Sequence, residues 1–435
     1  MSELASEPSN PAVSELAAGA SDAATVVVRT TRIPDPGGLL AVLPKTDPMA
    51  WVRRSEGIVG WGAAARIDTS GPTRFDDADA WWHELAGRTV VRDEVGLPGS
   101  GLVAFGSFGF ADDPGDSTLI VPDVVVGHRI VDDESIWWVT TVGVGALAAT
   151  PSIVRSPSPL PPVGLTYTDG AMSGAQWAHQ VRVAVERIGS TTLEKVVLAR
   201  DLIASATEPI DVRWPLHRLS VAYRSCWTYH VDGLLGATPE MLVRRERGLV
   251  TSRVLAGTIQ ITGDDTHDLA QAGALAKSSK DLEEHEYAVR SVAHALAPHC
   301  RSMNVPETPF VLHLPNVMHL ATDVTGVVAS NDSATSLALA AALHPSAAVG
   351  GTPTELAVDA IAELEGMPRR RYAGPVGWMD ASGDGEWGIA LRCGELSGSQ
   401  VRLFAGCGIV AGSDPEAELA EAQAKFVPVR DALGR

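Results

Sequence analysis

Acidic residues recur at helical spacing near the end of the chain and again in its middle. Glu418 and Glu421 lie three residues apart in a segment that opens with Ser413-Asp414-Pro415-Glu416, which we interpret as a capping box with proline in the first turn. Carboxylates at this spacing share one helix face and repel each other unless a cation lies beside them. Asp281 and Glu284 repeat the spacing. Hard cations prefer oxygen ligands, so the two pairs are candidate ligands of one magnesium ion.

The same spacing also fits two solvated helix faces. Lys277 and Lys280 precede Asp281 and Glu284. Lys425 follows Glu421 by about one turn. Exposed ion pairs within a helix are common and contribute little to stability. Taken alone, the spacing favours this second interpretation.

Two further residues have side chains that could move protons. Lys195 lies in TTLEKVVLAR, where alternation places it on the same strand face as Val197 and Ala199. Burial among apolar residues lowers the pKa of an amine, which would let Lys195 act as a base. Glu240 follows a strand and Pro239, so a turn fixes its position. A solvated lysine at a strand edge and an exposed turn glutamate are the commoner cases.

The string GCGIVA, residues 406–411, has the form of a dinucleotide-binding fingerprint. The helix after it begins only at Ser413 or Asp414, so the match is weak. We expect these glycines to let the backbone approach a small ligand closely. The cysteines form no CxxC pair, which argues against a zinc site and a disulfide framework; they are Cys226, Cys300, Cys393 and Cys407.

Composition and charge restrict the possible partners. The 435 residues are 45% hydrophobic and 20% charged, as in an ordinary globular protein. The formal net charge of -19, with no basic stripe, argues against binding to nucleic acid or to an anionic membrane surface. No apolar run reaches ~18 residues, and residues 1–24 do not resemble a secretory signal. We therefore expect a cytoplasmic protein, and, without a heptad or a large apolar stripe, a monomer.

The hydrophobic pattern predicts an α+β protein dominated by antiparallel sheet with helices packed outside. Residues 1–24 are predicted to be a disordered tail. Residues 25–150 form a β-rich half in which LLAVLPK is one predicted strand and DDADAWWHELAGR is a helix. After the Pro/Ser-rich segment PSIVRSPSPLPPVG, strands alternate with helices predicted at about 174–189, 266–297 and 414–433.

Taken together, the motifs resemble the chorismate-utilising family, which includes isochorismate, salicylate, anthranilate and aminodeoxychorismate synthases. The matching strings keep the family's order within residues 165–430: KVVLAR, GATPE, LAGT, KDLEEHEYAV, VMHL, HPSAAVGGTP, RRYAGPVGW, ALRCGEL and GCGIVAGSDPEAELAEAQAK. The resemblance implies a sandwich of two large stacked, mostly antiparallel sheets with peripheral helices. It also implies a single chorismate-binding catalytic domain over residues 25–435, with the motifs in residues 165–430.

The resemblance further implies a role for each matching residue. Glu284 and Glu421 would bind Mg²⁺, with Asp281 and Glu418 behind them, and the metal would hold the ring carboxylate of chorismate. This cation would make the charge at the substrate site positive, although the chain as a whole is acidic. The implied substrate-binding residues are Thr258 and His319 at the ring, Arg392 and Tyr372 at the pyruvyl carboxylate, Ala348 in HPSAAVGG, and Gly406, Gly408 and Lys425 in an anion cradle.

The branch of the family follows from the nucleophile. Members that use ammonia resemble one another in carrying glutamine at the position of Lys195, whereas water needs a base. Lys195 would deprotonate water for attack at ring carbon 2, and Glu240 would protonate the departing 4-hydroxyl. Ala256 stands where aminodeoxychorismate synthases carry a nucleophilic lysine, and Ala348 stands where salicylate synthases tend to carry threonine.

We therefore expect an isochorismate synthase, whose product feeds both menaquinone and siderophore synthesis. The alternative enzyme is a salicylate synthase, which carries isochorismate on to salicylate and pyruvate. A third hypothesis is a catalytically silent binding module that retains the fold. The presence of both Lys195 and Glu240 argues against this third hypothesis.

Overall fold

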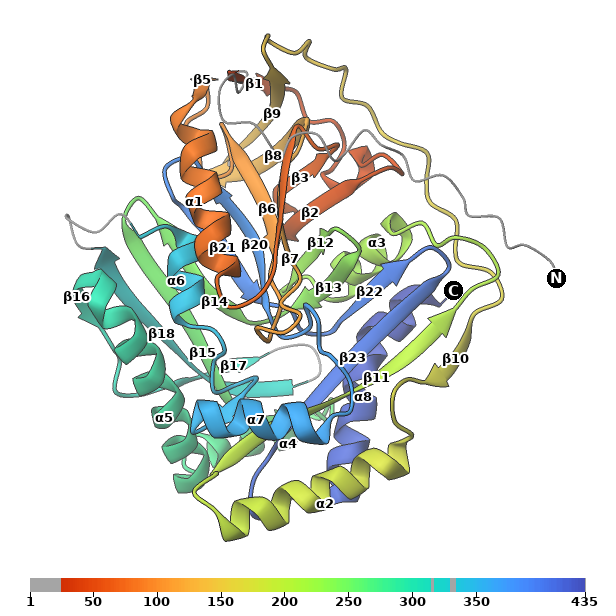
Figure 1. The fold of residues 1–435 in the computed structure, drawn as a ribbon, viewed down its shortest axis with the longest axis vertical. Helices are drawn as coiled ribbons and strands as arrows, with labels where there is room; N and C mark the ends of the chain where they lie inside the picture. The colour runs from red at the N-terminus through yellow and green to blue at the C-terminus, as the bar shows by residue number, and fades with distance from the viewer. Residues whose placement is uncertain (1–24, 314–316, 329–333, 435) are drawn as a thin grey trace, which may run out of the picture.

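The protein is built on two large sheets with helices around them (Figure 1). The structure, a computed structural model, describes residues 25–313, 317–328 and 334–434. It describes the backbone only at residues 256–258, 260, 279–281, 284 and 317. The predicted tail, residues 1–24, lies outside the described residues. The predicted α+β class with two mostly antiparallel sheets is confirmed.

The larger sheet has the strand order β10-β11-β23-β22-β13-β12-β2-β3-β8-β9-β1-β5, with β19 also pairing with β11. The pairing of β1 with β5 is parallel, and the other pairings described in this sheet are antiparallel. Its strands are β1 (Val26–Ile33), β2 (Pro48–Arg53), β3 (Glu56–Trp61), β5 (Thr89–Asp93), β8 (Val124–Val131), β9 (Glu134–Val144), β10 (Thr166–Asp169), β11 (Lys195–Ser205), β12 (Trp227–Val231), β13 (Leu234–Thr238), β19 (Gly351–Thr352), β22 (Cys393–Ser397) and β23 (Gln400–Ile409).

The smaller sheet has the order β16-β18-β15-β14-β21-β20-β6-β7-β4, with β17 also pairing with β18. Because β6 pairs with β20 and β2 pairs with β12, both sheets combine strands from the two halves of the chain. We infer that the described residues form one domain. The strands of this sheet are β4 (Ala65–Thr69), β6 (Val103–Ser107), β7 (Ser117–Val121), β14 (Met241–Glu246), β15 (Leu249–Gln260), β16 (Cys300–Asn304), β17 (Phe310–His313), β18 (Val317–Val328), β20 (Pro375–Asp380) and β21 (Gly385–Ile389).

The main hydrophobic core lies between the two sheets. Trp51 and Tyr229 from the larger sheet are buried in one cluster with Trp387 from the smaller sheet. The indole Nε1 of Trp51 donates a hydrogen bond of 2.7 Å to the carboxylate of Glu386, which ties the sheets together. A second cluster covers the outer face of the larger sheet. It includes residues of η1 (Leu40–Val42), α3 (Arg213–Ala222) and α8 (Pro415–Leu433).

The helices lie outside the sheets, and no helix in the described parts of the chain is long and apolar enough to cross a membrane. Their bounds are α1 (Arg74–Gly87), α2 (Gly174–Ser190), α3 (Arg213–Ala222), α4 (Asp265–Leu275), α5 (Ser279–Leu296), α6 (Ser336–Ala342), α7 (Thr354–Leu364) and α8 (Pro415–Leu433), with the 3₁₀ turns η1 (Leu40–Val42) and η2 (Ala297–His299).

Two predicted elements were wrong. The single helix at 266–297 is two helices, α4 and α5, separated by a turn at residues 276–278. The sequence Ser278-Ser279-Lys280-Asp281 contains the S-x-x-D pattern of a helix start, which the periodicity concealed. LLAVLPK contains a 3₁₀ turn in place of a strand, because Leu39, Val42 and Leu43 are buried at helical spacing.

A buried ion pair completes the edge of β11. One edge of this strand pairs with β23, whereas on the other edge β19 and β10 pair only with the two ends. Glu365 and Arg369 fill the gap between them, and their side chains are 1% and 2% exposed. Glu365 accepts a hydrogen bond from the Ala199 amide at 2.6 Å, and Arg369 donates to the Val197 carbonyl at 2.6 Å.

The remaining backbone groups of this gap also have partners. The Val197 amide donates to the Gly350 carbonyl at 2.8 Å, and the Trp177 indole donates to the Ala199 carbonyl at 3.0 Å. A buried backbone group without a partner destabilises the fold. The side chains therefore do here what a neighbouring strand does elsewhere in the sheet.

Removing one member of the buried pair should destabilise the protein strongly. We expect Arg369→Gln to lower the free energy of unfolding by about 3–5 kcal/mol, because the Glu365 charge stays buried without its partner. Denaturant unfolding of the purified variants measures this. The control is Arg187→Gln, which breaks the exposed pair with Glu363, two residues before Glu365, and should cost about 0–1 kcal/mol. Equal losses in the two variants would contradict the interpretation.

Candidate active site

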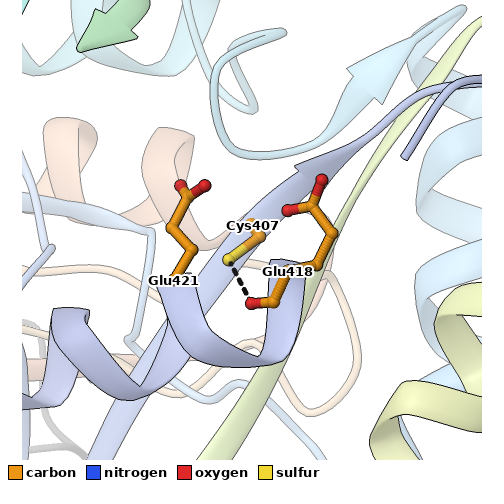
Figure 2. Close-up of side chains that lie close together, drawn as sticks. All are labelled: Cys407, Glu418 and Glu421. Atoms are coloured by element: carbon orange, nitrogen blue, oxygen red, sulfur yellow. Dashed lines mark hydrogen bonds between the residues drawn. The ribbon is translucent and has the colours of Figure 1, made fainter. Parts of the chain in front are cut away.

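The carboxylates of Glu418 and Glu421 lie at the start of α8, beside the end of β23 (Figure 2). Ligand atoms of Glu418, Glu421 and Cys407 all lie within 4.8 Å of one another. The Cys407 thiol donates to the Glu418 carbonyl at 3.4 Å, and burial raises its pKa to about 12. The sulfur is therefore a neutral thiol, and the two carboxylates are the donors that suit a hard cation.

The turn before α8 differs in detail from the predicted capping box. The Asp414 carboxylate accepts the hydrogen bond from the Ala417 amide at 2.9 Å, so Asp414 is the N-cap in place of Ser413. The Ser413 hydroxyl donates to Glu418 Oε1 at 2.8 Å. Burial raises the pKa of Glu418, the Ser413 hydrogen bond opposes this rise, and the nearby Glu421 charge adds to it. The serine thus orients a candidate ligand.

Lys425 joins α8 to β23. Its ammonium donates to the Gly406 carbonyl at 2.8 Å and forms an ion pair of 2.8 Å with Glu421. Burial alone would lower the pKa of Lys425, but its neighbours outweigh this effect and the pKa is raised; of these neighbours Glu421 forms the ion pair, whereas Cys407 is a neutral thiol near pH 7. The ion pair expected from helical spacing is therefore present. It holds a positive charge beside the candidate metal ligands.

The two glycines of β23 leave space for side chains of the site. A Cβ atom on Gly408 would lie 3.0 Å from Cε of Lys195, and one on Gly406 would lie 2.8 Å from the Tyr372 hydroxyl. Tyr372 is buried and stacks on Phe404, with ring centroids 5.2 Å apart. Burial raises the pKa of Tyr372 far above its ordinary value, so its hydroxyl stays a neutral donor.

Lys195 is the first residue of β11 and pairs with Thr352 of β19. As predicted, it begins an apolar strand face, since Val197 and Ala199 are 6% and 1% exposed. The lysine itself is partly buried. Its side chain lies against Gly408 on the neighbouring strand β23.

Glu240 lies where the chain passes from the larger sheet to the smaller one, between β13 and β14. Its amide donates to the Thr238 hydroxyl at 3.2 Å, and its carbonyl accepts from the Ile389 amide at 3.2 Å. The residue is 9% exposed. The interpretation of Glu240 as an exposed turn residue was therefore wrong, because the fold buries this passage from one sheet to the other.

Burial controls the charge of this glutamate. It raises the pKa of Glu240 to about 7, against the opposing influence of the positive charges of Lys195, Arg392 and Lys425. A large fraction of the carboxyl group is then protonated at neutral pH and can donate a proton. The three cations that act on Glu240 come from β11, from the turn before β22 and from α8.

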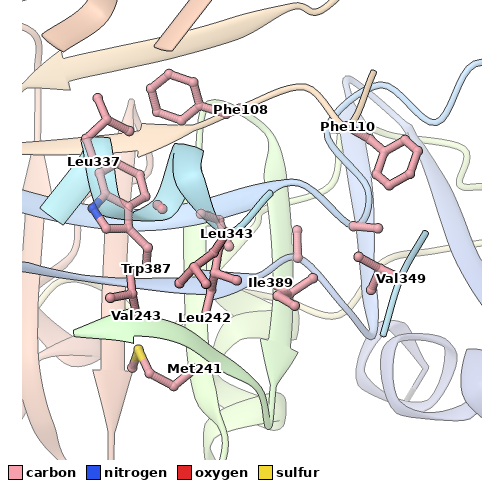
Figure 3. Close-up of a cluster of buried hydrophobic side chains, with 14 of the residues drawn as sticks. Phe108, Phe110, Met241, Leu242, Val243, Leu337, Leu343, Val349, Trp387 and Ile389 are labelled. Atoms are coloured by element: carbon pink, nitrogen blue, oxygen red, sulfur yellow. The ribbon is translucent and has the colours of Figure 1, made fainter. Parts of the chain in front are cut away.

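The polypeptide that follows Glu240 is anchored in the core. Met241, Leu242 and Val243 pack with Trp387 and Ile389 of β21, as Figure 3 shows. The same cluster holds Phe108, Leu337, Leu343 and Val349. This packing fixes the backbone next to Glu240.

A cavity of about 250 Å³ opens beside Glu240. Ala348 lies in its wall, as does Ser346, whose buried hydroxyl has no hydrogen-bond partner among the described residues. The cavity is therefore lined by one acid, Glu240, and by one residue whose buried hydroxyl lacks a described partner. Its other lining residues come from β14, β15, β21, α5, α7, and the end of α6 with the loop after it.

The described structure does not bring every predicted residue into view. Asp281 and Glu284 lie on α5 and Thr258 lies on β15, but their side chains are outside the described residues. Thr258 pairs with His319 of β18, which is 9% exposed. Arg392 has a φ of 47°, and its carbonyl accepts from the Ala237 amide at 3.3 Å.

Sequence reasoning missed the residues that hold the site together. Glu365 and Arg369 fix β11, and Arg369 also donates to the Val349 carbonyl at 2.7 Å, next to Ala348. Their spacing of four residues was the available signal, but it is equally common on exposed helix faces. The Ser346 hydroxyl had no signal beyond its place in HPSAAVGGTP.

Comparison with known proteins identifies the family. The profile of a family described as chorismate binding enzyme matches residues 152–434. The isochorismate synthase DhbC of Bacillus subtilis is 42% identical over 269 residues, covering 59% of this chain and 67% of the relative. The salicylate biosynthesis isochorismate synthase of Pseudomonas aeruginosa is 30% identical over 408 residues, covering 89% and 85%.

Solved structures show the same fold. The menaquinone-specific isochorismate synthase MenF of Escherichia coli matches with a TM-score of 0.77 and 26% identity, over 94% of this chain and 95% of that one. A DhbC structure from Bacillus anthracis matches with a TM-score of 0.73 and 30% identity, over 91% and 98%. Together with the profile match and the shared sequence strings, these likenesses show that the chain belongs to the chorismate-binding enzyme family.

Proposed function

We propose that the protein is an isochorismate synthase, which converts chorismate to isochorismate by adding water at ring carbon 2 with loss of the 4-hydroxyl. The observation that carries this proposal is a buried acid with a pKa of about 7, Glu240, under the electrostatic influence of Lys195. Relatives named isochorismate synthases support the same activity.

The proposed reaction uses these two side chains for opposite proton transfers. Lys195, in its neutral amine form, accepts a proton from water as the water oxygen bonds to ring carbon 2 and the double bonds shift around the ring. Glu240 gives its proton to the 4-hydroxyl, and the bond from carbon 4 to this oxygen breaks with release of water. The net reaction is an isomerisation, because one water enters and one leaves. General acid and base catalysis of this kind contributes about 10²–10⁴-fold to a rate.

Positive charge in the site is proposed to bind the anionic substrate within a chain of net charge -19. Arg392 and the neutral Tyr372 hydroxyl hold the pyruvyl carboxylate, and Lys425 completes the cradle with the backbone of Gly406 and Gly408. The position of Lys425, bonded to the Gly406 carbonyl, supports this assignment.

Mg²⁺ is the proposed cofactor, held by Glu421 and Glu284 with Glu418 and Asp281 behind them. The described half of this set fits, because two carboxylates converge at the start of α8 beside a thiol that stays protonated. When bound, the ion supplies positive charge for the ring carboxylate of chorismate. The described cysteines are free, which supports a reducing compartment such as the cytoplasm.

Lys195→Ala should lower isochorismate formation by about 10²–10⁴-fold, because water loses its base. The assay incubates purified protein with chorismate and Mg²⁺ and identifies the products by chromatography. Lys45→Ala, an exposed lysine, is the control and should keep full activity. Salicylate formed without an added lyase would reject the isochorismate synthase assignment in favour of salicylate synthase.

Glu240→Gln should lower the turnover rate by a similar factor and also change the pH dependence of stability. The pKa of Glu240 is about 7 in the folded state, against an ordinary value of 4.5. Its contribution to the free energy of unfolding of the wild type is therefore fully present below pH 4.5 and is lost as the pH rises to about 7. The variant lacks this titration. Its free energy of unfolding should therefore rise relative to that of the wild type between pH 4.5 and 7, by about 3 kcal/mol at the upper value.

Denaturant unfolding from pH 4 to 8 measures this difference. The matched control is Glu194→Gln, which changes an exposed glutamate just before β11. A difference between wild type and Glu240→Gln that does not grow with pH would show that Glu240 is not a buried acid.

Glu421→Gln should weaken the binding of Mg²⁺ by at least tenfold. Calorimetric titration of Mg²⁺ into protein without substrate gives a reading that does not depend on turnover. Glu416→Gln, an exposed glutamate in the first turn of the same helix, should leave the affinity unchanged. If both variants bind Mg²⁺ like the wild type, the carboxylates of α8 form a solvated face.

A further inference from the structure

His344 opens the string HPSAAVGGTP and lines the cavity beside Glu240. It lies two residues after the end of α6, and its amide donates to the Ala341 carbonyl at 3.1 Å. Ser346 and Ala348, which follow it, line the same cavity. The proposed reaction gives the imidazole of His344 no role, although a histidine in the wall of a cavity is a candidate for contact with a ligand.

One nitrogen of this imidazole is bonded to the backbone. The Nε2 atom of His344 lies 2.8 Å from the carbonyl oxygen of Phe110. A carbonyl oxygen can only accept, so Nε2 carries the hydrogen and donates it. The imidazole also contacts the Phe110 ring edge-on, with centroids 5.6 Å apart, and the Phe75 ring, with centroids 5.9 Å apart. These contacts hold the imidazole in one orientation.

The imidazole is neutral at neutral pH. Burial lowers the pKa of His344 to about 4, and the positive charges of Arg74 and Arg369 act in the same direction. The hydrogen bond to Phe110 and the charge of Asp112 oppose this fall. The neutral ring has a single hydrogen on nitrogen, and Nε2 holds it. The Nδ1 atom is therefore an acceptor with a lone pair.

This lone pair is available to a molecule in the cavity. The Nδ1 atom of His344 has no hydrogen-bond partner among the described residues. It is also accessible, because it is not one of the unpartnered atoms that the protein encloses completely, such as the Ser346 hydroxyl and the Nδ1 atom of His285. An accessible acceptor without a partner in the protein gains from a ligand that donates to it.

Glu240 and His344 offer opposite hydrogen-bonding groups to the same cavity. The protonated carboxyl group of Glu240 donates, whereas the Nδ1 atom of His344 accepts. A hydroxyl group can accept from the first and donate to the second at the same time. An ether or carboxylate oxygen has no hydrogen to donate, and an ammonium group has no lone pair. The two residues together therefore suit a hydroxyl group.

We propose that His344 is a substrate-binding residue whose Nδ1 atom accepts a hydrogen bond from the 4-hydroxyl of chorismate, while Glu240 donates to the same oxygen. The inference rests on the proposed function, because it gives the leaving hydroxyl a second contact. The bond to His344 directs a lone pair of the hydroxyl oxygen toward Glu240.

His344 takes no proton in this step. When the bond from carbon 4 to oxygen breaks, the oxygen leaves as water, with its own hydrogen and the proton from Glu240. The imidazole stays neutral, because Nε2 keeps its hydrogen on the Phe110 carbonyl. His344 therefore orients the leaving group, and Glu240 remains the acid.

Two substitutions separate the two ring nitrogens. His344→Gln can place an amide nitrogen near the position of Nε2, which keeps a donor for the Phe110 carbonyl but leaves no acceptor at the position of Nδ1. His344→Asn can place an amide oxygen near the position of Nδ1 but is too short to reach that carbonyl. We expect His344→Gln to lose affinity for chorismate and His344→Asn to lose stability while keeping the affinity.

Calorimetric titration with chorismate in a Lys195→Ala background measures binding without turnover. His344→Gln should weaken this binding by about three- to tenfold, the range of one neutral hydrogen bond. An analogue of chorismate with hydrogen in place of the 4-hydroxyl should bind equally well to the parent and to His344→Gln. Denaturant unfolding shows whether each variant is folded and how much stability it has lost.

His230 provides the matched control. Burial lowers its pKa to about 4 as well, and its Nδ1 atom donates to the Pro48 carbonyl. It does not line the cavity beside Glu240. His230→Gln should therefore lower the free energy of unfolding and leave the affinity for chorismate unchanged.

Two results would overturn the proposal. One is binding of chorismate by His344→Gln that equals binding by the parent. The other is an equal loss of affinity for chorismate and for the analogue without the hydroxyl, which would show that His344 acts through its shape. Failure of the proposed function would appear separately, as wild-type protein that binds chorismate but forms no isochorismate.

Discussion

The buried pair of Glu365 and Arg369 is the constraint on which the position of β11 depends. Strands β19 and β10 leave the middle of its outer edge open, and the two side chains bond the amide and carbonyl groups there. Burying two charges is unfavourable unless each is fully hydrogen-bonded, and here each is bonded both to the other and to the backbone. The strand that starts at Lys195 is consequently held from both edges.

This fixed strand sets the geometry of its neighbours. On β23, Gly408 lies against Lys195 and Gly406 lies against Tyr372, so the absence of side chains at these glycines lets two functional groups approach the sheet. The same strand leads into α8, where Lys425 returns to the Gly406 carbonyl. A lysine, a tyrosine and the α8 carboxylates are thus organised by one pair of strands.

The pKa of Glu240 depends on its position, where the chain passes from the larger sheet to the smaller one. Burial raises the pKa of this carboxyl group and three cations from separate elements oppose the rise, so that the pKa is about 7. Opposing effects of burial and charge therefore produce an acid suited to neutral pH. The residues that follow it, Met241 to Val243, belong to the main hydrophobic core.

Local rules in the sequence were sufficient for the elements and for the residue types of the site. Alternation gave β11 and its apolar face, and Asp414 and Pro415 marked the start of α8 to within a residue. Where one short apolar run fitted two structures, as in LLAVLPK, the sequence was ambiguous and the prediction was wrong. Only the tertiary structure decided that Glu240 is buried, that Glu365 and Arg369 complete a strand edge, and that Gly408 faces Lys195. These features join residues far apart in the chain, and burial, pKa and pairing depend on what the fold brings together, which no local pattern contains.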